Sequence, residues 1–236
     1  QAYDESVDVD ELMQHAEGEL FQLSQGNMKQ DYTQIDPVIK DAVDILQRAA
    51  QNKGGLTGIP TGYQQMDEMT SGWQPSDLVI IAGRPAMGKT SFALSIAKNV
   101  AVDYHVPIGF FSLEMNNVQL VNRLISNVCE IPGKKILNGQ LDPSEWERLD
   151  KKIRALTGAP IYVDDTPGLS VFELRTKARR LVREKGVKIL MIDYLQLMNA
   201  NGMKFGSRQE EVSTISRSLK GLAKELNIPV LALSQL

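Results

Sequence analysis

Apolar residues recur along this chain with two different periods, which alternate from about residue 56 onward. Five short runs are almost wholly apolar, as expected for strands buried on both faces of a parallel sheet; they cover residues 78–82, 107–113, 161–164, 187–192 and 229–233. Between them, apolar residues recur every three or four positions, which is helical spacing. This alternation predicts an α/β fold with a mostly parallel central sheet flanked by helices.

Residues with capping side chains mark where several of these helices begin. Asp142 with Glu145 predicts a helix that runs to Gly158, and Ser170 with Glu173 predicts another. Apolar spacing alone predicts the last helix, through Val212, Ile215, Leu219, Leu222 and Leu226.

The region before this alternation is predicted to be helical and to form a separate part of the chain. Residues 1–35 contain one amphipathic helix, and residues 36–53 contain a second, with Asp36 as its N-cap and Pro37 at its first position. The second helix carries one apolar stripe, formed by Ile39, Ala42, Val43, Leu46, Ala49 and Ala50. The residues leave open whether this stripe packs on its own domain or docks on a neighbouring subunit. We expect a single domain over residues 54–236.

The segment at residues 83–90 reads G-R-P-A-M-G-K-T and joins the apolar run at 78–82 to a helix. Its glycines allow the loop to turn backbone N–H groups toward phosphate oxygens, and the helix N-terminus adds partial positive charge. Lys89 can reach β- and γ-phosphates, and the Thr90 hydroxyl can bind Mg²⁺. The sequence therefore predicts a P-loop, with nucleotide contacts from Gly83, Arg84, Pro85, Ala86, Met87, Gly88, Lys89, Thr90 and Ser91.

Three further strand ends carry polar side chains, and ligands of parallel sheets bind beyond such ends. Asp193 closes an apolar run in the Walker B manner, so its carboxylate can hold a water on Mg²⁺ opposite Thr90. Glu114 would stand beside the γ-phosphate and orient or deprotonate the attacking water. Gln235 both donates and accepts, and could sense the γ-phosphate. For each residue, a plain polar strand end is the alternative.

These segments resemble the RecA-like motor domain of the bacterial replicative DNA helicases, the DnaB family. Besides the P-loop, the resemblance rests on segments that span residues 54–236: Phe111–Met115, Met191–Leu197, Ser216–Lys220 and Ala232–Leu236. Residues 1–53 resemble the end of that family's N-terminal region and its linker helix.

The resemblance implies a motor that hydrolyses ATP with Mg²⁺ and moves 5′ to 3′ on single-stranded DNA at the bacterial replication fork, in the cytoplasm. It implies that Lys89 and Thr90 bind nucleotide and metal, that Asp193 supports the metal, and that Glu114 is the catalytic base. Gln235 would be the γ-phosphate sensor. It further implies a homohexameric ring in which the second helix packs on the adjacent subunit, with primase and a helicase loader as partners.

The resemblance also implies where DNA binds and what this chain lacks. The loop at residues 199–208, with Lys204 and Arg208, would face the centre of the ring and track phosphates; Lys204 as a solvated loop lysine is the alternative. The family's chain continues beyond Leu236 to an arginine finger, which is worth roughly 10³ to 10⁵ in turnover. We therefore expect a fragment that hydrolyses ATP weakly on its own.

Composition narrows the possible function classes only slightly. The formal net charge of −3 argues against DNA binding over the whole surface, so any DNA contact must be local. Cys129 is the only cysteine in the sequence, and no apolar run approaches the ~18 residues of a membrane span.

The rival functions are a RecA-like recombinase and a nucleotide-gated scaffold without turnover. The signature at residues 111–115 favours a helicase over the first, and Glu114 argues against the second.

Overall fold

The computed structural model describes residues 34–51, 56–198 and 207–236. The chain divides into two units, Gln1–Arg48 and Ala49–Leu236, and each is described by itself. The predicted helix within residues 1–35 lies almost wholly outside the described residues.

Helix α2 (Ile35–Gln51) corresponds to the predicted second helix and begins two residues before Pro37, its predicted first residue. Asp36 therefore lies in the first turn and is not the N-cap, which corrects the prediction; it still complements the helix dipole there. The large side chains of the predicted apolar stripe, Ile39, Val43 and Leu46, are exposed, with Leu46 67% accessible to solvent. Ile35 and Val38, also in α2, are exposed as well.

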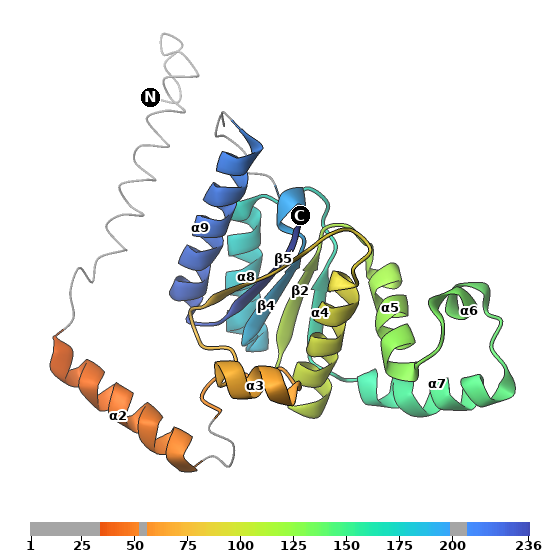
Figure 1. Cartoon of the computed structure of the whole chain (residues 1–236), viewed down its shortest axis with the longest axis horizontal. Helices are drawn as coiled ribbons and strands as arrows, with labels where there is room; N and C mark the ends of the chain where they lie inside the picture. Colours follow the sequence, from red (N-terminus) through yellow and green to blue (C-terminus); the bar gives the residue numbers. More distant parts are fainter. Residues whose placement is uncertain (1–33, 52–55, 199–206) are drawn as a thin grey trace, which may run out of the picture. The chain divides into compact units, whose positions relative to one another are not determined.

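The second unit is built on a five-stranded sheet in which every neighbouring pair of strands is parallel (Figure 1). The strand order is β1-β5-β4-β2-β3. Each of the five predicted apolar runs overlaps one of these strands, which confirms the predicted fold class: β1 (Leu78–Gly83), β2 (Ile108–Ser112), β3 (Ile161–Asp164), β4 (Ile189–Asp193) and β5 (Val230–Gln235). Because all five are parallel, their carboxyl ends lie along one edge of the sheet.

Seven α-helices in the described residues accompany the sheet: α3 (Gln64–Thr70), α4 (Lys89–Lys98), α5 (Asn117–Cys129), α6 (Gly133–Asn138), α7 (Pro143–Leu156), α8 (Val171–Lys185) and α9 (Arg208–Leu226). The two predicted capping boxes are present: Asp142 accepts the Glu145 N–H at 2.9 Å, and Ser170 accepts the Glu173 N–H at 3.1 Å. In the part of the chain that the structure describes, no helix is long and apolar enough to cross a membrane.

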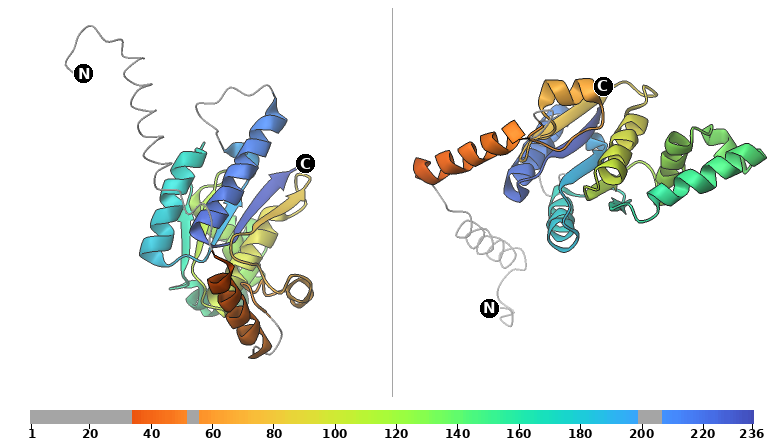
Figure 2. Two further views of the ribbon diagram at one scale, coloured as in Figure 1. Left: turned by 90° about the vertical axis from the view of Figure 1, so that its left-hand side faces the viewer. Right: turned by 90° about the horizontal axis from the view of Figure 1, so that it is seen from below.

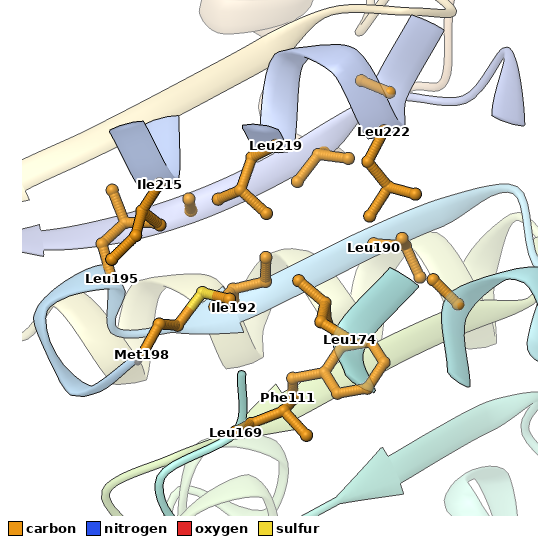
Figure 3. Packing of buried hydrophobic residues seen from close by; sticks show 14 of the residues in the cluster. Phe111, Leu169, Leu174, Leu190, Ile192, Leu195, Met198, Ile215, Leu219 and Leu222 are labelled. Carbon is orange, nitrogen blue, oxygen red and sulfur yellow. The ribbon is translucent and has the colours of Figure 1, made fainter. Parts of the chain in front are cut away.

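Helices cover both faces of the sheet, because successive strand residues point to opposite sides. Leu190 and Ile192 of β4 pack with residues of α8 and α9, such as Leu174 and Leu219 (Figure 3). Ile189 and Met191 face the other way; they belong to the cluster that includes Leu94 of α4 and Leu120 and Leu124 of α5. Full burial of such side chains stabilises the fold by roughly 1.5–3 kcal/mol each. The strand ends that carry the candidate site are thus held by a packed core on both faces.

Candidate active site

The four predicted site elements meet at the carboxyl edge of the sheet, as expected. The P-loop follows β1, Gln235 ends β5, Asp193 ends β4 and Glu114 lies two residues beyond β2. These strands are consecutive in the sheet. Gly83 is in register with Gln235, and Ser112 with Asp193. Figure 2 shows the end of β5 beside the turn that joins β1 to α4.

The P-loop has the backbone conformation that its glycines predict. Gly88 has a φ of 82° and is the N-cap of α4, and an added Cβ there would meet nothing within 4 Å. The glycine is therefore needed for its conformation and not for space. Ala86 also has a positive φ, of 61°. Helix α4 begins at Lys89, so the last two residues of the P-loop, Lys89 and Thr90, lie in its first turn.

The Lys89 ammonium lies over the P-loop, where phosphates would bind. Its Nζ donates to the carbonyl oxygen of Gly83 at 2.6 Å and to that of Arg84 at 3.0 Å. The Gly83 oxygen also accepts the N–H of Leu236 at 3.2 Å. The loop's own carbonyls therefore position a cation at the helix N-terminus, which favours an anionic ligand.

Asp193 is a buried carboxylate beside the P-loop, with only 1% of its surface exposed. Its Oδ2 is buried without a hydrogen-bond partner, and among the described side chains no other buried polar atom lacks one. Burial raises the pKa of Asp193; the Thr90 hydroxyl acts to lower it, whereas nearby Glu114 adds to the rise. A carboxylate left unpaired in this way is stabilised by a bound cation, so Thr90 and Asp193 fit the predicted Mg²⁺ site.

Glu114 is exposed and is tied by its neighbours to the end of β4. The Leu113 N–H donates to the Asp193 carbonyl oxygen at 2.8 Å, and the Ser112 hydroxyl donates to the Met115 carbonyl oxygen at 2.7 Å. Glu114 lines a cavity of about 490 Å³ that reaches Ser91 at the start of α4; Arg123 and Asn127 of α5 also line it. The carboxylate thus has open space next to the P-loop.

Gln235 is exposed at the end of β5, and its main chain is held by a residue that sequence reasoning missed. The Gln235 N–H donates to Gln196 Oε1 at 3.2 Å, and Gln196 Nε2 donates to the Gln235 carbonyl oxygen at 2.9 Å. Gln196 lies three residues beyond Asp193, in the 3₁₀ turn Leu195–Leu197. The sequence does hint at this role, because Gln196 is a polar residue between Leu195 and Leu197, shortly after the strand that ends at Asp193.

The predicted DNA contacts fall at the border of the described residues. Lys204 lies outside them. Arg208 is the first residue of α9, and its guanidinium contacts the Glu211 carboxylate and the Gln196 carbonyl oxygen. Its side chain remains 53% exposed.

A parallel sheet with a P-loop after β1 and a buried aspartate at the end of β4 defines a P-loop NTPase core. The particular family is shown by a sequence model described as "DnaB-like helicase C terminal domain", which matches residues 58–236. The chain belongs to this DnaB-like helicase family, and its fold is the RecA-like ATPase fold of its structural neighbours.

Relatives with similar sequences are named replicative DNA helicases. The chain is 42% identical over 234 residues to the replicative DNA helicase DnaB of Geobacillus stearothermophilus, covering 99% of this chain and 52% of that protein. It is 44% identical over 241 residues to the DnaB of Rhodothermus marinus, covering all of this chain and 25% of that protein. The chain thus spans between about a quarter and a half of the length of these relatives.

Two of the solved structures that share this fold illustrate the likeness. One is described as an ATPase domain; it has a TM-score of 0.78 and 37% identity, covering 87% of this chain and 72% of that one. The other, a DnaB-like replicative helicase described with its interactions with primase, has a TM-score of 0.75 and 36% identity, covering 94% of this chain and 53% of that one.

Proposed function

We propose that this chain is the ATP-hydrolysing motor of a replicative DNA helicase that translocates 5′ to 3′ on single-stranded DNA and unwinds the duplex at the replication fork. One observation carries the ATPase part: the unpartnered Asp193 oxygen beside Thr90, at the mouth of a P-loop, in a chain of the DnaB-like family. The names of the relatives support the DNA part. They favour a helicase over a recombinase or a scaffold ATPase.

Binding of ATP uses the residues around the P-loop. Lys89 turns its ammonium from the loop carbonyls toward the β- and γ-phosphates, and the backbone N–H groups of residues 86–90 face the phosphate oxygens. Thr90 directly, and Asp193 through water, would hold Mg²⁺, which supplies positive charge against the phosphates when bound. The partial positive charge of the α4 N-terminus acts in the same direction.

Hydrolysis uses Glu114 and Gln235. The Glu114 carboxylate orients the attacking water and accepts its proton, while the water oxygen bonds to the γ-phosphorus and the bond to the β–γ bridging oxygen breaks. ADP and inorganic phosphate are the products. Gln235 contacts the γ-phosphate with its carboxamide, so it distinguishes ATP from ADP.

Assembly into a homohexamer would give the exposed stripe of α2 a place to pack, on the adjacent subunit. In such a ring, Lys204 and Arg208 contact DNA phosphates, and six copies of a weak site acting on one strand bind it more tightly than a single copy does. Primase and a helicase loader are the proposed partners, and the bacterial cytoplasm is the proposed compartment.

Sedimentation with Mg²⁺ and ATP tests the ring: a hexamer supports it, and a monomer at all concentrations contradicts it.

Glu114→Gln tests the proposed chemistry, because glutamine can still orient a water but cannot accept its proton. ATP binding is expected to stay within about threefold of wild type, while the rate of phosphate release falls at least about 10²-fold. The matched control is Glu147→Gln, which removes an exposed carboxylate of α7 and should leave both measurements unchanged. Wild-type turnover in Glu114→Gln would remove the proposed role of the carboxylate.

A further inference from the structure

Strand β5 continues beyond the point where its pairing with β4 ends. The register of β4 with β5 runs from Leu190 and Val230 to Ile192 and Ala232, while β5 extends to Gln235. After Asp193 the chain leaves the sheet and forms the 3₁₀ turn Leu195–Leu197. The last residues of β5 therefore need other partners on that side.

The Gln196 side chain supplies those partners. Its Nε2 donates to the Gln235 carbonyl oxygen and to the Ser234 hydroxyl, each at 2.9 Å, and its Oε1 accepts the Gln235 N–H at 3.2 Å. A carboxamide offers the same donor and acceptor as a peptide group. The side chain of Gln196 thus reproduces one step of a β ladder, which a carboxylate could not do because it has no donor.

The other side of Gln235 faces the P-loop. Gln235 is in register with Gly83 across the β1–β5 pair, and the next N–H, that of Leu236, donates to the Gly83 carbonyl oxygen at 3.2 Å. The same oxygen also accepts a hydrogen bond from the Lys89 ammonium. The main chain of Gln235 is therefore fixed between Gln196 and the first residue of the P-loop, while its side chain stays exposed.

Gln196 is in turn held from the start of α9. Its carbonyl oxygen accepts a hydrogen bond from the Arg208 guanidinium, which also pairs with Glu211. Gln196 thus joins the end of β5, through its side chain, to the first turn of α9, through its main chain.

We propose that Gln196 is a positioning residue that fixes Gln235 for contact with the γ-phosphate. The proposal rests on the proposed function, in which Gln235 is the group that distinguishes ATP from ADP. Gln196 itself touches no phosphate; it holds the main chain from which the Gln235 side chain extends. Loss of the Gln196 carboxamide therefore weakens recognition of the γ-phosphate and leaves binding of the other two phosphates intact.

Equilibrium binding of fluorescent ADP and of a fluorescent, non-hydrolysable ATP analogue, both with Mg²⁺, tests this proposal. The variants are Gln196→Glu, which keeps the length and one acceptor but lacks the donor, and Gln196→Met, which lacks both. Each is expected to bind ADP within about twofold of wild type and the ATP analogue about tenfold more weakly, as for one lost hydrogen bond to a charged group. Gln140→Glu, in the exposed loop before α7, is the matched control and should change neither affinity.

Gln235→Ala separates this proposal from the proposed function. If Gln235→Ala loses the preference for the ATP analogue while both Gln196 variants keep it, Gln196 does not position Gln235 and the inference is overturned. If Gln235→Ala also keeps the preference, it is the sensor role within the proposed function that fails. The double variant Gln196→Met with Gln235→Ala should lose no more preference than Gln235→Ala alone, because both changes act on one contact. If the losses of preference in the two single variants instead add up in the double variant, Gln196 and Gln235 do not act on the same contact.

Discussion

The Asp193 carboxylate is buried with one oxygen unpartnered, an arrangement that costs folding free energy. Burial raises its pKa, which expresses the same cost. Residues that weaken the folded state in this way concentrate at functional sites, where a bound ligand offsets the cost. The placement of Asp193 beside Thr90 thus agrees with a metal-binding role.

Asp193→Asn should therefore separate stability from activity. The amide keeps an oxygen for Thr90 and removes the buried charge, so the free energy of unfolding without Mg²⁺ should stay the same or rise by about 1 kcal/mol. The rate of ATP hydrolysis should fall at least about 10²-fold. Denaturant unfolding and phosphate release measure the two effects, with Asp150→Asn, an exposed aspartate of α7, as the control. A loss of stability above about 2 kcal/mol would contradict this account of Asp193.

Single residues with fixed spacing could be predicted from the sequence, and contacts made by chain turns could not. Lys89 and Thr90 follow from the P-loop pattern, and Asp193 from its place after an apolar run. Gln196 escaped prediction, because its contact with β5 arises only when the chain leaves the sheet after β4 and turns back. The positive φ of Ala86 was likewise missed, because alanine gives no sign of that conformation.

At the scale of elements, every predicted strand exists, but the ends of several differ. Val187 and Leu113 are buried yet lie outside β4 and β2, although both fell within predicted apolar runs. Hydrophobic patterning reports burial, whereas a strand ends where ladder hydrogen bonds stop, so the two limits need not coincide. The sequence analysis also gave no residue range for helix α5 and did not identify its capping box, which Asn116 and Gln119 form.

The connection of β3 to α8 gives an element-scale prediction about pH. Lys177 of α8 donates to the Asp164 carboxylate at 2.7 Å, and the Thr166 N–H donates to it at 3.0 Å. Burial acts to raise the pKa of Asp164, but these hydrogen bonds outweigh it, so the pKa lies below its ordinary value of 3.8. A lowered pKa means that the contact stabilises the fold above pH 3.8 and that the contribution is lost as the pH falls through the lower, folded-state pKa.

Lys177→Met should therefore reduce the free energy of unfolding by about 0.5–1 kcal/mol at pH 7 and by much less near pH 2. Denaturant unfolding at several pH values measures the difference. Lys151→Met, which changes an exposed lysine of α7, should show no such dependence on pH. A difference between wild type and Lys177→Met that stays constant down to pH 2 would contradict the ion pair.

At the scale of the whole molecule, the sequence predicted the parallel α/β core and the meeting of four strand ends. The strand order β1-β5-β4-β2-β3 was not predicted, because apolar runs carry no information on which strands are neighbours. That order places Gln235 directly between the P-loop and Asp193. The P-loop and the end of β5 are thereby neighbours at the carboxyl edge of the sheet.

The most direct test of the proposed motor is strand displacement by the protein at its full natural length. The substrate is a forked duplex with a free 5′ tail, with Mg²⁺ and ATP present. The account predicts unwinding by wild type and by Lys134→Ala, which changes an exposed lysine of α6, and a loss of at least about 10²-fold in Lys89→Ala, which lacks the ammonium that binds phosphates. Unwinding that persists in Lys89→Ala, or ATP hydrolysis by wild type without any unwinding, would contradict a helicase driven from this P-loop.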